Sequence, residues 1–388
     1  MAIPVVIGID KLAADYASIL ENRRVGLITN QAAVNAKLIS TVDILYNAIG
    51  TQMTTLFAPE HGVRGVLPAG AEVADEVDPQ TILPVYSLYG ENREPTAAML
   101  QKVEVLIIDL PDIGCRYWTY LSTLFYALRA AGRHQIPSIV LDRPNPITGS
   151  HVAGNILEKE FTSFVGIAQI PIRFGMTIGE MARLFNEVYD LKADLTVITM
   201  DNWQRTLWYD ETGLSWVAPS PNMPSLTTPL VYPGTCLIEG TNLSEGRGTT
   251  QPFELVGAPW LDGWQLAQHL NTQELPGVRF RPASFIPTYS KHSNQLCHGI
   301  QVHVIHREEF QPVRTGLHIL AAIKERSKGQ FAWLEPTSGT DRPFIDLLAG
   351  TDTLRRDIDR ERHPDEIWEQ WQEELTPWLE LRRKYLIY

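Results

Sequence analysis

The chain has 388 residues, of which 44% are hydrophobic and 20% are charged, a composition that excludes an intrinsically disordered protein. This length exceeds what one hydrophobic core usually organises, so we expect two domains. The formal net charge of −12 argues against nucleic-acid binding, because an acidic surface repels a phosphate backbone.

Residues 1–200 alternate short apolar strands with amphipathic helices. The predicted strands are 25–29, 54–57, 105–109, 138–141 and 195–199, and the predicted helices are 41–49, 96–103, 121–131 and 177–189. Near-continuous apolar strands joined by helices are typical of a parallel sheet that is covered on both faces. We therefore predict an α/β fold whose first domain spans residues 1–200.

Residues 201–388 have a different pattern and are predicted to form a smaller α+β domain. They begin with a region rich in proline, glycine and threonine, 219–259, which we interpret as a long functional loop. Predicted helices follow at 261–270, 315–325 and 365–385, and predicted strands at 278–281 and 299–305.

Polar residues follow each of the first four predicted strands. They occupy positions 30–31, 58–65, 109–117 and 142–146. Ligands of open parallel sheets bind outside the carboxyl ends of the strands. Single turns of this composition are common, but four of them along one edge indicate a binding site.

Glu60 is the sharpest catalytic candidate in this set. Pro59 and Gly62 flank it in a stiff turn, and Arg64 offers an opposite charge. A partly enclosed carboxyl group can act as a general acid. The alternative is a carboxylate that only pairs with Arg64. His61 is interpreted as a hydrogen-bonding residue of the site and not as a metal ligand.

Other residues along the same edge are candidate substrate contacts. Asp109 and Asp142 end apolar strands and are candidate substrate contacts. The alternative is that each caps the turn that follows, or that Asp142 pairs with Arg143. Arg116, Tyr117 and Tyr120 suit a sugar that carries a carboxylate, or they pack on the rim of the domain. Three further candidate contacts are Asn145, Asn222 and Lys291, the last of which is otherwise a solvated lysine.

A second polar cluster, residues 239–249, contains two carboxylates and several glycines. No Gly-Lys-Ser/Thr or GxGxxG pattern is present, so a phosphate-binding loop is not predicted. We expect this loop of the second domain to face the edge of the first domain's sheet across a cleft, where Glu239 or Glu245 lies opposite Glu60. Paired carboxyl groups across a cleft are what glycoside hydrolysis requires. The alternative is an ordinary connector.

No cofactor and no metal site is predicted. The three cysteines are widely spaced and fit buried thiols, and the scattered histidines near Cys297 lie on opposite sides of a strand. The first ten residues lack the pattern of a signal peptide, and no apolar segment is long enough to span a bilayer. We therefore expect a cytoplasmic location, or an extracytoplasmic one if a leader has been removed.

Seven ordered segments together resemble one known family. They are Gly-Leu-Ile-Thr-Asn-Gln (26–31), Pro-Glu-His-Gly-Val-Arg-Gly (59–65), residues 109–120, Asp-Arg-Pro-Asn-Pro (142–146), Gly-Met-Thr-Ile-Gly-Glu (175–180), Pro-Ser-Pro-Asn-Met-Pro (219–224) and residues 239–252. They are similar to the NamZ-type exo-β-N-acetylmuramidases, glycoside hydrolase family 171. The similarity runs from about residue 7 to the C-terminus.

The resemblance implies a Rossmann-like first domain and an active site between the two domains, but no nicotinamide, because residues 30–33 lack a glycine fingerprint. It implies release of terminal N-acetylmuramic acid from the non-reducing end of peptidoglycan fragments. Glu60 is then the general acid, and Arg64, Arg116 and Arg247 bind the lactyl carboxylate and the N-acetyl group. The alternatives are a non-catalytic cell-wall sugar-binding protein and an acyl hydrolase, although no Gly-x-Ser-x-Gly elbow is present.

Overall fold

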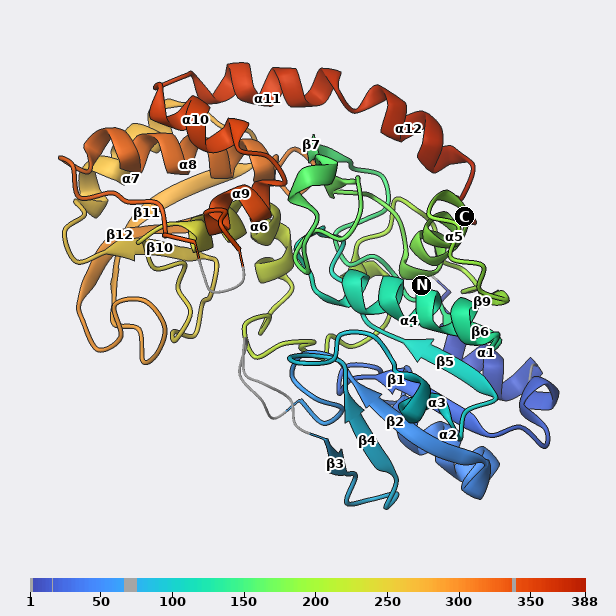
Figure 1. The fold of residues 1–388 in the computed structure, drawn as a ribbon. Helices are drawn as coiled ribbons and strands as arrows, with labels where there is room; N and C mark the ends of the chain where they lie inside the picture. The colour runs from blue at the N-terminus through green and yellow to red at the C-terminus, as the bar shows by residue number, and fades with distance from the viewer. Residues whose placement is uncertain (1–2, 16, 66–74, 337–339) are drawn as a thin grey trace.

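The computed structural model describes residues 3–15, 17–65, 75–336 and 340–388, and the chain forms two lobes (Figure 1). Met1 and Ala2 of the segment searched for a leader lie outside the described residues. The first lobe contains a seven-stranded sheet in the order β3-β4-β2-β1-β5-β6-β9. Its strands are β1 (Val25–Thr29), β2 (Met53–Ala58), β3 (Glu76–Val77), β4 (Pro84–Ser87), β5 (Val105–Asp109), β6 (Ser138–Leu141) and β9 (Leu195–Ile198). Every pair is parallel except β3 with β4, which confirms the predicted α/β fold.

Both faces of this sheet are covered, because successive residues of its central strands enter different cores. Leu27 and Ile107 pack in the core beneath α1 (Gly8–Asp15) and α2 (Thr41–Ile49). Their neighbours Ile28 and Ile108 pack in the other core, which α3 (Ala97–Leu100), α4 (Tyr120–His134) and α5 (Ile178–Val188) cover. Burial on both sides explains why the strands are almost continuously apolar.

The order of the strands creates a crevice at the carboxyl ends of β1 and β5. The chain moves outward from β1 to β2 and β4, and then returns to place β5 on the other side of β1. Ligands bind at such a switch point. The segments that follow β1, β2 and β5 therefore meet on this side of the sheet.

The second lobe contains a three-stranded antiparallel sheet in the order β10-β12-β11. Its elements are α6 (Thr227–Thr235), β10 (Leu255–Ala258), α7 (Gly263–Thr272), β11 (Val278–Phe285), β12 (Cys297–Val304), α8 (Pro312–Arg326), α9 (Phe344–Ala349), α10 (Thr353–Asp359) and α11 (Pro364–Glu373). A small hairpin of β7 (Ala153–Ile156) and β8 (Pro171–Arg173) connects to the first lobe. The smaller α+β domain is thus present.

Two predictions for this half were wrong in detail. The 219–259 region is not one irregular loop, because it contains α6 and β10. Pro229 is tolerated in the first turn of α6, where backbone N–H groups have no helical partner. The predicted helix 365–385 is two helices, since Pro377 lies in the first turn of a new one, α12 (Thr376–Arg383).

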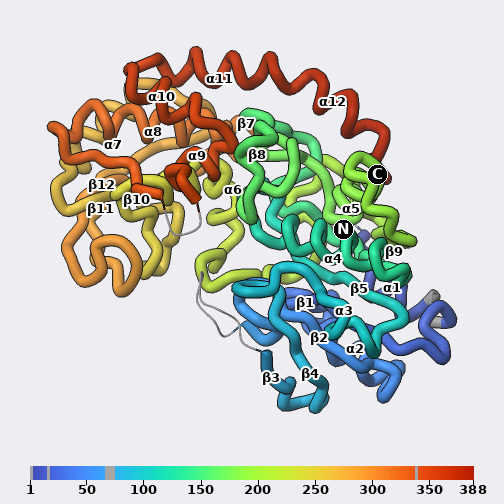
Figure 2. Tube along the Cα trace, in the orientation of Figure 1, coloured from blue at the N-terminus to red at the C-terminus, as the bar shows by residue number. Residues whose placement is uncertain are grey.

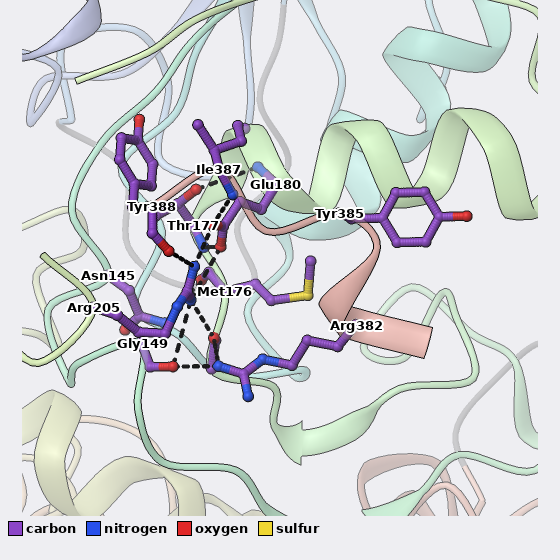
Figure 3. A network of polar contacts seen from close by, with 12 residues as sticks. Asn145, Gly149, Met176, Thr177, Glu180, Arg205, Arg382, Tyr385, Ile387 and Tyr388 are labelled. Carbon is purple, nitrogen blue, oxygen red and sulfur yellow. Dashed lines mark hydrogen bonds and ion pairs between the residues drawn. The ribbon is translucent and has the colours of Figure 1, made fainter. Parts of the chain in front are cut away.

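The C-terminal segment returns to the first lobe. Figure 2 shows α11 and α12 crossing from the second lobe to the neighbourhood of α5. In Figure 3 the last residues lie against a polar network, where the Ile387 N–H donates to Glu180 Oε1 at 2.8 Å. The Tyr388 hydroxyl donates to Asp142 Oδ2 at 2.8 Å and accepts from the Met200 N–H at 2.7 Å. Residues 201–388 are therefore not confined to one lobe, and the domain boundary at residue 200 stays a prediction. Within the described ranges no helix is long and apolar enough to cross a membrane.

Candidate active site

A pocket of about 500 Å³ is lined by residues from both lobes. This volume lies within the range of about 300–1,000 Å³ that small-molecule sites occupy. The polar residues of the lining are Glu60, His61, Tyr89, Tyr117, Thr119, Ser220, Asn222, Tyr232, Glu239, Glu245, Arg247, Tyr289, Ser290 and Lys291. The pocket therefore brings Glu60 to the same cavity as the two candidate carboxylates of the 239–249 segment.

A tight turn after β2 positions Glu60. The Gly62 N–H donates to the carbonyl oxygen of Pro59 at 3.1 Å, and His61 and Gly62 have φ values of 76° and 81°. A left-handed conformation is unfavourable for histidine, so the surrounding packing must hold it, and His61 is only 2% exposed. The turn therefore fixes the position of Glu60 at the edge of the sheet.

Neutral donors contact Glu60. Thr119 Oγ1 donates to Glu60 Oε2 at 2.7 Å, and the Tyr120 hydroxyl donates to the Glu60 backbone carbonyl at 3.2 Å. Thr119 stands at the N-cap of α4, but its hydroxyl does not cap the helix. Burial raises the pKa of Tyr89, and its hydrogen bond to Glu60 and the charge of that carboxylate raise it further, so the phenol remains a donor.

The second lobe supplies two ion-paired carboxylates. Arg247 Nε donates to Glu239 Oε1 at 2.6 Å and lies 3.4 Å from Glu245 Oε1. Lys291 Nζ lies 2.8 Å from Glu245 Oε2 and donates to the Thr241 carbonyl at 2.9 Å. Burial lowers the pKa of Arg247, but the two carboxylates raise it more, so that it lies above its ordinary value. Arg247 is a permanent cation of this pocket.

Three buried donors in the lining have no partner among the described residues. They are Trp118 Nε1, Arg247 Nη1 and Asn222 Nδ2. The Asn222 side chain is oriented by the Tyr289 hydroxyl, which donates to Asn222 Oδ1 at 2.8 Å. A buried donor without an acceptor is unfavourable by about 1–3 kcal/mol, so these groups are suited to a ligand oxygen.

Most of the predicted site residues converge here. Glu60, His61, Tyr117, Asn222, Glu239, Glu245, Arg247 and Lys291 all line the pocket. Tyr120 lies behind it, because its hydroxyl shares its single hydrogen between the Glu60 carbonyl and the Pro219 carbonyl, which is 3.1 Å away, and its ring is fully buried. Tyr120 therefore positions the Glu60 turn and does not belong to the lining.

Two predicted substrate-binding arginines lie outside the pocket lining. Arg64 forms an ion pair with Asp78, with Nε 2.8 Å from Oδ1. Arg116 is 1% exposed and donates only to backbone carbonyls in the described structure, including Asn155 at 2.7 Å and Ala349 at 2.7 Å. Arg116 thus joins the β7–β8 hairpin to the end of α9. Neither side chain belongs to the pocket lining, and their role in substrate binding stays a prediction.

Three further candidate residues lie outside the pocket lining and contact other groups of the protein. Asp109 is fully buried and pairs with Arg143, whose Nη2 lies 2.8 Å from Oδ2. Asp142 is also fully buried and accepts from the Gly179 N–H at 2.8 Å. Asn145 accepts from the Ile147 N–H at 3.1 Å, as a turn residue does. These contacts are structural, and none of the three residues belongs to the pocket lining.

Sequence reasoning missed Tyr89 and Thr119, which both contact Glu60. Thr119 lies inside the 109–120 motif, so its position next to Tyr120 was a usable signal. Tyr89 follows β4, a four-residue strand that was not predicted, and its sequence context contains no signal.

Two lobes of α/β structure whose carboxylates meet in one pocket have the layout of a glycoside hydrolase. Family models of the exo-β-N-acetylmuramidase NamZ match this chain, the N-terminal model over residues 25–227 and the C-terminal model over residues 230–388. The chain therefore belongs to the NamZ exo-β-N-acetylmuramidase family, which confirms the predicted family and makes it an enzyme.

Individual relatives agree with this assignment. The chain is 48% identical over 381 residues to the peptidoglycan β-N-acetylmuramidase NamZ of Bacillus subtilis (strain 168), covering 98% of this chain and 91% of that protein. Two crystal structures of DUF1343 family proteins from Bacteroides fragilis NCTC 9343 have the same fold. One has a TM-score of 0.91 at 35% identity with full coverage of both chains, and the other 0.79 at 29% identity with 99% coverage of each.

Proposed function

We propose that the protein releases terminal N-acetylmuramic acid from the non-reducing end of peptidoglycan fragments, with Glu60 as the general acid. The observation that carries this proposal is that one pocket is lined by Glu60 from the first lobe and by Glu239 and Glu245 from the second. Glycoside hydrolysis needs one carboxyl group to protonate the leaving oxygen and a second to attack or to activate water.

Glu60 suits the acid role because it lines the pocket and hydroxyl groups orient its carboxyl group there. Thr119 Oγ1 donates to Glu60 Oε2 at 2.7 Å, and the Tyr89 hydroxyl forms a hydrogen bond with the same carboxyl group. The rigid Pro59–Gly62 turn fixes the direction in which the proton is delivered.

Glu239 is the better candidate for the second carboxylate. Its side chain is 16% exposed, whereas that of Glu245 is 2% exposed and is held by both Arg247 and Lys291. A group that reaches the sugar must be accessible from the pocket. Glu245 then orients the two cations.

Arg247 and Lys291 are the groups that recognise the acidic sugar. Arg247 Nη1 is an unused donor in the lining, and guanidinium groups bind carboxylates strongly. This assignment gives the lactyl carboxylate a binding site in the second lobe, in place of Arg64 and Arg116. The non-catalytic sugar-binding alternative is not favoured, because the matching family is one of enzymes. The cytoplasmic location stays a prediction.

The test is hydrolysis of a chromogenic N-acetylmuramide by Glu60→Gln. Loss of the general acid is expected to lower kcat by about 10² or more. Glu76→Gln, at an exposed position of the same lobe, is the matched control and should retain wild-type activity. Glu239→Gln should cost more in kcat than Glu245→Gln. A Glu60→Gln variant that is as fast as the wild type would remove the proposed mechanism.

A further inference from the structure

The short helix that carries Glu239 has a closely packed backbone. It is the 3-10 helix η5 (Cys236–Gly240), which follows α6 directly. Gly240 approaches the start of α9 so closely that a Cβ atom at this position would lie 2.6 Å from the Cα atom of Ile345. This contact fixes the backbone of η5 against α9. The direction of the Glu239 carboxylate then depends on the groups that hold its side chain.

Arg247 holds one oxygen of this carboxylate. Its Nε donates to Glu239 Oε1 at 2.6 Å, and its Nη2 lies 2.5 Å from the same oxygen. The guanidinium group is itself supported by the ring of Phe253, with Cζ 5.0 Å from the ring centroid. Both contacts are made to Oε1, so this ion pair alone does not fix the direction of Oε2.

Cys236 contacts the other oxygen of the same carboxylate. Its thiol donates to Glu239 Oε2 at 3.5 Å, a contact distance that reflects the large radius of sulfur. The three-residue spacing explains the contact, because side chains at positions i and i+3 of a 3-10 helix lie directly above each other. Burial raises the pKa of the Cys236 thiol well above its ordinary value, and the charge of Glu239 raises it further. The sulfur therefore keeps the hydrogen that it donates.

Tyr232 holds the thiol in turn. Its hydroxyl donates a hydrogen bond to Cys236, and burial keeps the pKa of this phenol well above its ordinary value. The Tyr232 ring lines the active-site pocket and packs edge-on against Phe253, with ring centroids 4.7 Å apart. A phenol, a thiol and a carboxylate thus form a row of hydrogen bonds that ends at Glu239 Oε2.

We propose that Cys236 is a positioning residue for the reaction and that its thiol orients Oε2 of Glu239 toward the sugar. A thiol is a weak donor and a guanidinium group a strong one, so Oε2 keeps more of its basicity than Oε1. Oε2 is then the oxygen that attacks the sugar or activates water. The proposal rests on the proposed function, because it takes Glu239 to be the second carboxylate. The alternative is that Cys236 only fills the core as a small apolar residue.

The experiment measures kcat and KM of variants on a chromogenic N-acetylmuramide. Cys236→Ala removes the donor and should lower kcat about tenfold with little change in KM, whereas Cys236→Ser keeps a donor and should retain most of kcat. The core-filling alternative predicts the opposite order, because an apolar site accepts a methyl group more readily than a hydroxyl group. In a Glu239→Gln background, Cys236→Ala should cost no further kcat. Cys297→Ala removes another fully buried thiol of the second lobe and is the matched control, which should alter neither constant.

A Cys236→Ala variant with the kcat of the wild type would overturn the proposal, as would an equal loss in Cys236→Ala and Cys236→Ser. A wild-type enzyme that does not hydrolyse the N-acetylmuramide contradicts the proposed function instead. The infrared S–H stretching band, assigned to Cys236 by its loss in Cys236→Ser, then still decides whether the thiol holds Glu239. Glu239→Gln should shift this band to higher frequency, because a neutral amide is a weaker acceptor than a carboxylate, and an unchanged band refutes the contact.

Discussion

Asp142 at the end of β6 offers a quantitative test of the electrostatics of the first lobe. The side chain is fully buried and accepts hydrogen bonds from Thr177 Oγ1 at 2.8 Å and from the Tyr388 hydroxyl at 2.8 Å. Burial raises its pKa to about 7, although these donors and the Gly179 N–H act in the opposite direction. The native state therefore holds a proton on Asp142 that the unfolded chain, with a pKa of about 3.9, releases.

The sign of the pH dependence follows from this difference. Between pH 4 and pH 7 the native state binds one more proton than the unfolded state, so the free energy of unfolding falls as the pH rises. The contribution is fully present below pH 4 and is lost as the pH passes 7. Between pH 5 and pH 8 the change amounts to about two pKa units, or about 2.6 kcal/mol.

The perturbation is Asp142→Asn, which keeps the shape of the side chain and removes its titration. Urea unfolding of wild type and variant is measured at pH 5 and at pH 8 by tryptophan fluorescence. The stability advantage of the wild type should be larger at pH 5 than at pH 8 by about 2.6 kcal/mol. Taking the difference between the two proteins cancels other groups, including Asp112, whose pKa burial also raises to about 7. An advantage that is constant, or that grows toward pH 8, would refute the reasoning.

Three further substitutions separate the roles of individual residues. Thr119→Val removes the hydroxyl on Glu60 and should lower kcat about tenfold with little change in KM, whereas Thr119→Ser should stay near wild type in the same steady-state assay. Arg247→Gln should reduce the preference for an N-acetylmuramide over an N-acetylglucosaminide about tenfold, where the preference is the ratio of the two kcat/KM values. An unchanged ratio would show that the lactyl group binds elsewhere. Arg116→Met removes the hydrogen-bond donors of several buried carbonyl groups and should lower the free energy of unfolding by about 3 kcal/mol. The folded protein should keep the KM of the wild type, and a raised KM would instead support a role of Arg116 in substrate binding.

The central strands were predictable because burial on both faces leaves a continuous apolar run in the sequence. Strands β1, β5 and β6 have the predicted bounds, and so does α2. The hairpin of β7 and β8 and the strand β4 were missed, although they are about as short as β6, because glycine, proline and polar residues interrupt their apolar runs. Such strands depend on tertiary partners that the local sequence does not specify.

The candidate site was predictable to the extent that strand ends determine which segments meet. Glu60 was found because it follows β2, and the 239–249 segment because of its composition and its resemblance to the family. The arginines could not be assigned in this way. Arg116 has the same residue type and the same loop position that a carboxylate receptor would have, but its partners are carbonyl groups of residues far away in the chain. Only the packing of the hairpin against α9 reveals that role.

The two lobes contribute different kinds of charged residue to the pocket. Of the described residues that line it, Arg247 and Lys291 are the only arginine and lysine, and both come from the second lobe. Glu60, in contrast, is mounted on the first lobe and contacts hydroxyl groups. In the proposed mechanism, recognition of the acidic sugar and protonation of its leaving oxygen therefore belong to different lobes. Substitutions at Arg247 or Lys291 should act mainly on KM and on selectivity, and substitutions at Glu60 mainly on kcat, because ground-state binding and the transition-state proton depend on separate groups.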